Sequence, residues 1–439
     1  MKRFLFVFSM VFLHSTASAD IPIQHWTLDN GAKVYLVEVP GLPMVDMQVE
    51  FDAGGRRDGG FNGLSSATAS MMAKGVKALG NQAAMDENAL GEAWADLGAQ
   101  VNASSSSDRM SLSLRSLTRP ELLDAAVALA ARQMAHPSFP NAIWQNERER
   151  WVASIKEANT KPATLANRAY NKALFGDHPY GAEVDEASLR RIDTALMATF
   201  HADHFKPCMA KVSIVGAINR AQAQERVKQL LQHLPVEAAC PVLPSLPEVQ
   251  PLKQAQTLKV PFESAQAHVF IGQVGIARQN PDFFALTLGN YVLGGGGFVS
   301  RLTNEVREKR GLSYSVYSYF SPGQHAGAFM VGLQTRPDQA AQAVQVASDV
   351  LAEFVRTGPT EQEVQAAKDF LIGGFALRID SNRKLLDNLS NIAWFDLPLD
   401  YLDTWAAEMD KLTAAQIQQA FARNLQPQRM VSVILGGKP

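Results

Sequence analysis

The chain has 439 residues, of which 46% are hydrophobic and 19% are charged, and its formal net charge is −2. This length suggests two to four domains with enough apolar material for their cores. The nearly balanced charge gives no reason to expect nucleic acid or an anionic membrane surface as a partner. No run of about 18 apolar residues follows the N-terminal segment, so we expect a mature chain without a membrane span.

The first 19 residues have the pattern of a signal peptide. Lys2 and Arg3 give a positive start, the apolar stretch 4–13 is too short to span a bilayer, and residues 17–19 form a small-residue cleavage site. An uncleaved membrane anchor is the alternative, but small residues follow the apolar run. We therefore expect export across the inner membrane, a periplasmic location in a bacterium, and a mature chain that begins at Asp20.

The first half of the chain, residues 20–235, combines strand and helix patterns. The Asn30-Gly31 turn indicates a hairpin that ends near Glu38, and an alternating stretch predicts a strand over 44–51. Further strands are expected at 109–115 and 211–215, and helices at 62–77, 87–97, 120–134, 142–159, 162–175, 188–205 and 221–234. Asn62 is placed to cap the first of these helices.

Cys208 and Cys240 are the two cysteines of the chain. In an oxidising compartment they can pair, which would close a loop of about 32 residues and contribute about 3–4 kcal/mol. Two buried, unpaired thiols are the alternative, and export to the periplasm favours the disulfide only slightly.

The second half of the chain, residues 256–439, repeats the first. A proline-rich linker over 236–255 separates them. The repeat consists of strands at 267–274, 312–320 and 326–334 and helices at 282–293, 337–357 and 361–379. The sequence therefore predicts an α+β fold with two tandem homologous domains, each a mostly antiparallel sheet with helices packed on one face.

A run of four glycines opens the most unusual stretch of the second half. It consists of Gly294, Gly295, Gly296 and Gly297. Glycine destabilises helix and strand interiors, so the run predicts a loop, and the missing Gly-Lys-Ser/Thr sequence makes it a poor phosphate loop. A helix with Leu302, Val306 and Phe298 on one apolar stripe is expected next, and Gly311 is placed to end it.

Arg307 and Tyr314 flank the corner between that helix and the strand expected at 312–320. A guanidinium fork and a phenol donor beside a glycine loop can hold a peptide carbonyl or an anion. From spacing alone, a surface helix arginine and a half-buried strand tyrosine are the simpler interpretation.

Three stretches of the chain together resemble the pitrilysin family, which includes insulin-degrading enzyme and mitochondrial processing peptidase. They are LGGGGFVSRLTNEVREKRGLSYSV in the second half, and NERERWVASIKEA and FGDHPYG in the first. With the duplicated domain and the central linker, the resemblance covers nearly the whole mature chain. It implies a fold in which the second half faces a zinc site in the first half.

The resemblance also implies where such a zinc site would lie. The family's motif is H-x-x-E-H on a first-half helix, followed by a glutamate about 75 residues on. Here Ser66 and Ser70 stand at the histidine positions and Ala69 at the general-base position, and only Glu147 matches a ligand. Serine is a poor zinc ligand and alanine cannot accept a proton, so we expect neither bound zinc nor autonomous peptidase activity.

Arg307 and Tyr314 match the arginine and tyrosine that face the zinc site in the family. The resemblance implies that Tyr314 donates to the oxyanion of the tetrahedral intermediate and that Arg307 holds a substrate carbonyl. It further implies that Asn102 and Ala103 lie on an edge strand that binds peptide by strand addition, in a half that has lost its chemistry. The glycine run 294–297 would give a substrate room to approach.

Some pitrilysin-like bacterial systems divide H-x-x-E-H and the arginine–tyrosine pair between two subunits, and this chain resembles the second kind. The expected function is that of a subunit without a cofactor of its own, in a heterodimer with an H-x-x-E-H-bearing partner that holds zinc and cleaves peptides or unfolded proteins. A catalytically inert structural or peptide-binding protein is the main alternative. An autonomous metallopeptidase with a different zinc site is the third.

The histidines of the chain offer little support for a different metal site. His201 and His204 are three residues apart on an expected helix without a third ligand nearby, whereas a catalytic zinc needs three protein ligands. We expect both to be structural. His178 precedes a proline and is expected in a loop.

Overall fold

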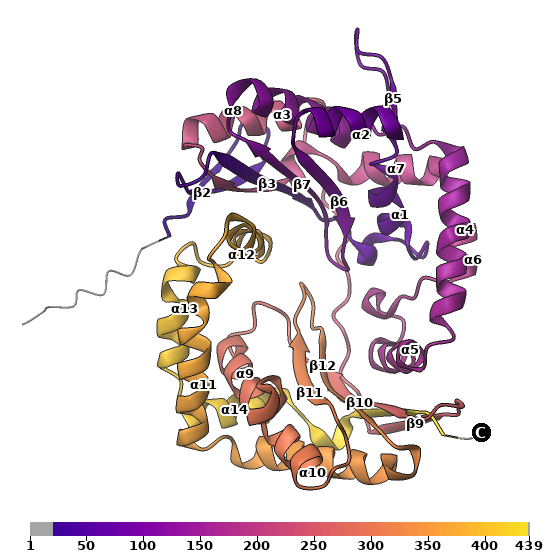
Figure 1. Ribbon diagram of the computed structural model, residues 1–439, viewed down its shortest axis with the longest axis vertical. Helices are drawn as coiled ribbons and strands as arrows, with labels where there is room; N and C mark the ends of the chain where they lie inside the picture. Colours follow the sequence, from indigo (N-terminus) through magenta and orange to yellow (C-terminus); the bar gives the residue numbers. More distant parts are fainter. Residues whose placement is uncertain (1–20, 438–439) are drawn as a thin grey trace, which may run out of the picture.

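The computed structural model describes residues 21–437 as two α+β halves, which lie one above the other in Figure 1. The expected signal peptide, residues 1–19, lies outside the described residues. Over 21–437, no helix is both long enough and apolar enough to cross a membrane.

A six-stranded sheet in the order β1-β2-β8-β3-β7-β6 forms the first half. Its strands are β1 Gln24–Thr27, β2 Lys33–Glu38, β3 Met44–Phe51, β6 Gln100–Ser105, β7 Met110–Leu117 and β8 Lys211–Gly216, and a separate short pair joins β4 Gly75–Val76 to β5 Met85–Asp86. Only β2 and β8 run parallel. The hairpin predicted around Asn30-Gly31 joins β1 and β2 and is confirmed.

Eight helices accompany this sheet within the described residues. They are α1 Leu64–Met71, α2 Glu87–Asp96, α3 Pro120–Ala135, α4 Asn141–Ala158, α5 Pro162–Phe175, α6 Glu186–Arg190, α7 Thr194–His204 and α8 Arg220–Leu231. The single helix predicted at 188–205 is wrong, because the Asp193 carboxylate accepts a hydrogen bond from the Leu196 N–H and starts a new helix there.

Helix α1 is shorter than predicted at both ends. The Asp58 carboxylate accepts hydrogen bonds from the Gly63 and Ser65 N–H groups at 2.7 and 2.9 Å, and so satisfies the start of the helix. The expected cap, Asn62, instead donates its amide to the Glu183 carbonyl at 2.9 Å. After Met71 the chain turns into β4, which ends the helix before residue 77.

The second half repeats the plan of the first. Its sheet has the order β11-β12-β10-β13-β9, with β9 Gln256–Val260, β10 Ala267–Val274, β11 Val316–Ser321, β12 Ala328–Thr335 and β13 Val431–Leu435. Its helices are α9 Phe283–Asn290, α10 Ala340–Thr357, α11 Glu361–Gly373, α12 Asn382–Trp394, α13 Tyr401–Asp410 and α14 Ala414–Asn424. Read from β9, this order matches β2-β8-β3-β7-β6, and β9/β13 is again parallel. The predicted α+β duplication is confirmed.

Each half contributes one helix to the sheet of the other. Helix α5 packs on β10 and β13, whereas α12 packs on β3 and β8, as Figure 1 shows. Strands β10 and β13 hold the same places in the second sheet as β3 and β8 hold in the first, so the exchange of helices is reciprocal. Tyr170 of α5 joins a core with Phe270 and Val433, and Leu389 of α12 joins one with Val215. The exchanged helices therefore bury sheet faces that the helices of the same half leave open.

A polar cluster also joins the halves; we call it the interdomain cluster and define it as Arg56, Asp108, Tyr180, Glu248 and His325. The Tyr180 hydroxyl donates to Asp108 Oδ1 at 2.6 Å and accepts from the His325 N–H at 3.1 Å. Arg56 Nε lies 3.2 Å from Asp108 Oδ1, and His325 Nδ1 lies 2.8 Å from Glu248 Oε1. Tyr180 belongs to the FGDHPYG stretch, which thereby fixes the second half against the first.

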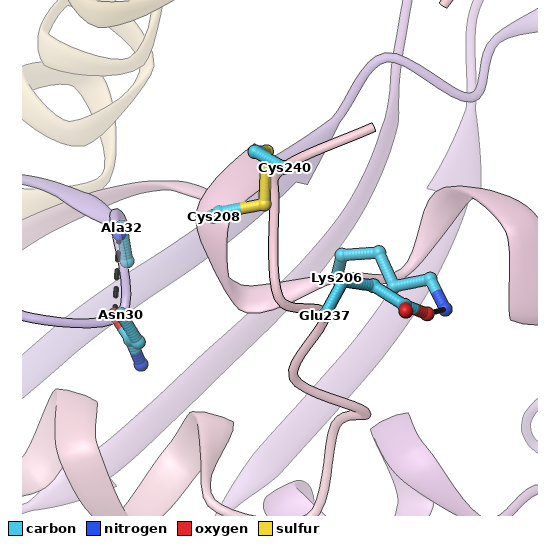
Figure 2. Close-up of a disulfide and its surroundings, with 6 residues drawn as sticks. All are labelled: Asn30, Ala32, Lys206, Cys208, Glu237 and Cys240. Carbon is cyan, nitrogen blue, oxygen red and sulfur yellow. Dashed lines mark hydrogen bonds and ion pairs between the residues drawn. A yellow bond between two sulfur atoms is a disulfide. The ribbon is translucent and has the colours of Figure 1, made fainter. Parts of the chain in front are cut away.

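The expected linker, 236–255, has no helix and no strand. Figure 2 shows how its start is attached to the first half, by the Cys208–Cys240 disulfide and by an ion pair of 2.5 Å between Lys206 and Glu237. Further along, the Arg57 guanidinium donates to the Pro244 carbonyl at 2.5 Å. With Glu248 in the interdomain cluster, the linker is held at several points along its length.

Candidate functional site

Arg307 and Tyr314 lie against each other at the surface of the second half. Arg307 lies on the π-helical segment Thr303–Glu308, and Tyr314 lies in the irregular segment before β11. The guanidinium carbon lies 4.6 Å from the centre of the Tyr314 ring and 4.7 Å from that of Phe298. Contacts of this kind contribute about 0.5–1 kcal/mol each at exposed sites. The two aromatic rings therefore limit the positions that the guanidinium can take.

The Tyr314 side chain is 82% exposed, and within residues 21–437 no hydrogen bond involves its hydroxyl. The strand predicted over 312–320 begins only at Val316, so the expectation of a half-buried strand tyrosine is wrong. The Ser313 hydroxyl lies 2.7 Å from the Ser315 carbonyl oxygen and 2.6 Å from the Gln334 carbonyl oxygen, so its single proton can be donated to either. The phenol is consequently free to donate to a bound group.

The glycine run is not the simple loop that the sequence predicts. Gly294 and Gly295 belong to the π-helical turn Tyr291–Gly295 that continues α9. A side chain at Gly294 would collide with the Ser318 hydroxyl and backbone, so glycine allows this turn to approach β11 closely. Gly297 has φ +59°, a conformation that favours glycine, and it begins a short turn that exposes Phe298. The predicted apolar stripe is correct for Leu302 and Val306, which are buried, and wrong for Phe298.

The three positions expected to correspond to the zinc motif lie together on α1 and have three different environments. Ser66 is exposed and lines a cavity of about 530 Å³ with Trp151 and Tyr180. Ala69 is buried and Ser70 is half-buried. Over residues 21–437, no three side chains of His, Cys, Asp or Glu are grouped so that they could hold a metal. A hydroxyl and a methyl group supply neither the ligands nor the base that zinc hydrolysis needs.

Glu147, on α4, is paired with two cations, of which Lys74 lies just after the end of α1. Lys74 Nζ lies 3.6 Å from Glu147 Oε1 and 2.7 Å from Glu87 Oε1, and the Arg150 guanidinium donates to Glu147 at 2.9 Å. The hydrogen bond with Glu87 raises the pKa of Lys74, so its ammonium stays charged. Sequence reasoning missed Lys74, although the helix predicted over 62–77 would place it one turn after Ser70; in the structure it lies in the turn that follows α1.

Asn102 and Ala103 lie on β6, at the edge of the first sheet. They pair with Ser113 and Leu112 of β7 on one side, and the Asn102 side chain is exposed whereas Ala103 is half-buried. Helix α1 packs beside this strand, as Figure 1 shows. The structure thus brings the edge strand and the helix with the expected zinc-motif positions together.

The three histidines that the sequence singled out form no metal site. His201 Nε2 lies 2.7 Å from the Met134 carbonyl, and burial lowers the pKa of this histidine to about 4. His204 Nδ1 lies 2.8 Å from the carbonyl of Phe200. His178 accepts a hydrogen bond from the Tyr180 N–H at 3.1 Å, so it positions a member of the interdomain cluster.

Two family models match most of the chain. The model described as "Insulinase (Peptidase family M16)" matches residues 33–187, and that described as "Peptidase M16 inactive domain" matches residues 191–371. A crystal structure of a peptidase M16 inactive domain from Pseudomonas fluorescens is 33% identical with a TM-score of 0.89, and the match covers 95% of this chain and 98% of that chain. The chain belongs to the M16 (pitrilysin) peptidase family.

Relatives of this M16 chain carry contrasting names. The "uncharacterized zinc protease YmxG" of Bacillus subtilis is 25% identical over 373 residues, which cover 84% of this chain and 88% of the relative. The "non-peptidase homolog YmxG" of Helicobacter pylori is 25% identical over 451 residues, which cover 100% of this chain and 99% of the relative. Similarity therefore extends to a protein named as a peptidase and to one named as a non-peptidase.

The chemistry available to this M16 chain follows from its side chains. Tyr314 has a free hydroxyl donor and Arg307 a guanidinium that two rings hold in place, so the corner can bind a carbonyl oxygen or a developing oxyanion. The serines and the alanine of α1 cannot replace the metal-bound hydroxide that attacks a peptide bond in a zinc peptidase. The described residues thus offer an exposed hydroxyl donor and a guanidinium at this corner.

Proposed function

We propose that this M16 chain is the zinc-free subunit of a heterodimeric metallopeptidase that cleaves peptides or unfolded proteins. The partner would be an M16 chain with an intact H-x-x-E-H motif and its zinc. The observation that carries the proposal is the Arg307–Tyr314 corner. Tyr314 is 82% exposed and its hydroxyl has no hydrogen-bond partner among residues 21–437, in a chain with Ser66, Ala69 and Ser70 at the positions of the zinc motif.

In this heterodimer, Tyr314 would donate its O–H to the oxyanion that forms at the partner's zinc, and Arg307 would hold a carbonyl of the substrate backbone. The Tyr314 donor is stronger toward a charged oxygen than toward a neutral carbonyl, so it favours the transition state over the bound substrate, whereas Arg307 would contribute to binding of the substrate backbone. Of the glycine run, only Gly297 has open space around its Cα, whereas Gly294, Gly295 and Gly296 pack against Ser318, Asn290 and Tyr291, so room for a substrate would exist at Gly297 alone. The N-terminal segment with the signal-peptide pattern supports export, and we place the complex in the periplasm.

The test replaces Tyr314 by phenylalanine in the co-expressed pair. We expect Tyr314→Phe to lower kcat about 10²–10³-fold, because one donor to the oxyanion is lost, while the heterodimer still assembles. Tyr317→Phe is the matched control, since Tyr317 is also a partly exposed tyrosine of the same stretch, and it should leave kcat unchanged. Equal rates for the wild-type and Tyr314→Phe pairs would rule out the proposed role.

The second candidate is a catalytically inert peptide-binding or structural M16 protein, which the name of the Helicobacter pylori relative favours. The two candidates separate when the native complex is isolated from cells and assayed. The heterodimer proposal expects co-purification with a zinc-bearing M16 chain and peptide cleavage by the complex. The inert alternative expects no cleavage by any complex and no effect of Arg307→Ala.

A further inference from the structure

A cavity of about 440 Å³ lies in the second half, between α9, β11, α12 and α13. Its wall includes several aromatic residues, among them Phe283, Phe375, Tyr401 and Trp405. The rings of Phe375 and Trp405 stack with centroids 4.6 Å apart and an interplanar angle of 11°. A cavity of this size and character suits an apolar or aromatic group of a small ligand.

Two arginines and no carboxylate line this cavity. The Arg278 guanidinium donates to the Tyr401 hydroxyl at 2.6 Å and lies 3.6 Å above the Phe283 ring. Arg378 is exposed and lies 5.7 Å from the Trp405 ring. In the part of the chain that the structure describes, neither arginine forms an ion pair with a carboxylate. Burial lowers the pKa of Arg278, yet a guanidinium stays protonated in proteins, so the cavity holds uncompensated positive charge.

The other polar side chains of the wall already have partners. The Asn290 amide donates to the Ser318 carbonyl at 3.0 Å and accepts from the Ser318 hydroxyl at 2.7 Å. Asn388 donates to two backbone carbonyls of its neighbourhood, and Asn391 accepts from Arg109 at 2.7 Å. The arginines are therefore the side chains of this wall best placed to receive an acidic ligand.

We propose that this cavity binds a carboxylate attached to an apolar or aromatic group, with Arg278 as the carboxylate anchor and Arg378 at the rim. An arginine fork matches the two oxygens of a carboxylate, and pairing would compensate a charge that burial makes unfavourable. The apolar group would lie against the aromatic wall. Two sources share this chemistry: the C-terminus of a peptide that ends in an apolar residue, and a small apolar carboxylic acid. The site needs neither the zinc-bearing partner nor the Arg307–Tyr314 corner.

The experiment measures binding to the purified chain alone by titration calorimetry. The probes are an N-acetylated peptide that ends in Phe with a free carboxylate, the same peptide as its C-terminal amide, and 3-phenylpropionate. We expect the amide to bind at least about tenfold more weakly than the acid, because it lacks the charge that pairs with the guanidinium. A peptide acid that binds tighter than phenylpropionate assigns the site to peptide C-termini, and equal affinities assign it to the small acid.

Variants test the arginine anchor directly. Arg278→Gln should weaken binding of the acids at least about tenfold and leave the affinity of the amide unchanged. Arg378→Gln, at an exposed position, gives a second test if Arg278→Gln does not fold. This variant should also weaken the binding of the two acids. Arg356→Gln is the control, because Arg356 is exposed on α10, pairs with Glu353 and is outside the cavity. Equal affinity for acid and amide, unchanged binding in both cavity variants, or no binding of either acid would overturn the proposal.

Discussion

Lys74 places its ammonium group 3.6 Å from Glu147, beside the helix that carries zinc ligands in M16 peptidases with an intact motif. A cation therefore already neutralises the one carboxylate that this chain keeps. Restoring histidines at positions 66 and 70 would supply three protein ligands with Glu147, but the bound metal would then meet a positive charge nearby. We therefore expect Lys74 to oppose zinc binding even when both imidazoles are supplied.

We expect the double variant Ser66→His/Ser70→His to bind zinc weakly. Adding Lys74→Met should tighten zinc binding about tenfold, since a nearby like charge opposes the metal by roughly 1–2 kcal/mol in a partly exposed site. Competition with a zinc-chelating dye measures both dissociation constants. Equal zinc dissociation constants for the double variant and for the triple variant with Lys74→Met would contradict the role that we give this lysine.

Glu50 is a buried carboxylic acid whose charge state depends on its surroundings. It is fully buried on β3, its Oε1 lies 3.0 Å from Arg109 NH1, and its Oε2 has no hydrogen-bond partner among the described residues. Burial raises its pKa to about 7, although Arg109 opposes the shift. An unfolded glutamate titrates near pH 4.3, so the folded state disfavours ionisation, and stability should fall as pH rises from about 4.3 through 7.

Glu50→Gln should reduce this loss of stability at higher pH. The free energy of unfolding, measured by urea at pH 5 and pH 8, should fall less in the variant than in the wild type, by on the order of 1–3 kcal/mol. Glu353→Gln, at an exposed position, should follow the wild type. An equal fall in the free energy of unfolding between pH 5 and pH 8 in wild type and Glu50→Gln would show that Glu50 is already ionised at pH 5.

Among the elements, the exchanged helices α5 and α12 decide how the halves fit together. Tyr170 of α5 is fully buried, and its hydroxyl donates to the Phe329 carbonyl of β12 at 2.7 Å. Directly beneath it, Gly272 of β10 has no side chain, and a Cβ there would collide with the Phe329 carbonyl and the Tyr170 hydroxyl. A glycine in a strand of the second half thus makes room for a helix of the first.

Gly272→Ala should therefore displace α5 and destabilise the protein by about 2 kcal/mol or more, as overpacking does in a rigid core. Gly91→Ala is the matched control, because Gly91 lies within α2 with open space around its Cα, and alanine should stabilise that helix by about 0.5–1 kcal/mol. Chemical denaturation gives both values. A Gly272→Ala protein as stable as the wild type would show that α5 docks less tightly than the structure indicates.

For the molecule as a whole, the interdomain cluster and the linker provide a pH-dependent connection. His178 accepts a hydrogen bond from the Tyr180 N–H through Nδ1, and its Nε2 lies 3.0 Å from the Pro247 carbonyl, an arrangement that requires the neutral ring. Burial lowers the pKa of His178, with His325 and Arg56 acting in the same direction. Unfolded histidine protonates near pH 6.5. The stability that neutral His178 contributes to the folded state is therefore complete above pH 6.5 and is lost as the pH falls below it.

Lowering the pH from 7.5 to 5.5 should accordingly loosen the linker and speed its cleavage by an added protease. His178→Asn keeps an acceptor for the Tyr180 N–H but does not titrate, so its cleavage rate within 236–255 should change less with pH. His233→Asn, a distant histidine, should behave as the wild type. If the ratio of cleavage rates at pH 5.5 and pH 7.5 were the same in wild type and His178→Asn, His178 would not be the cause of the pH dependence.

Some properties of this protein were already decided by the sequence. The duplication, the hairpin at Asn30-Gly31 and the helix over 162–175 were all predictable, because turn chemistry and hydrophobic periodicity act between neighbouring residues. The absence of zinc ligands is equally local, since it depends only on which side chains occupy positions 66, 69 and 70.

Other properties depend on residues that are distant in sequence, and only the tertiary structure decided them. The pattern of 162–175 shows a helix but not that it covers β10 and β13, and the cavity around Arg278 appears only when α9, α12 and α13 meet. The strand before β12 begins late because Ser313 reaches the Gln334 carbonyl across the sheet, and the glycine run continues a helix because it packs against Ser318. Burial and hydrogen bonding between distant segments outweigh local propensity at these places, so the local sequence alone could not predict them.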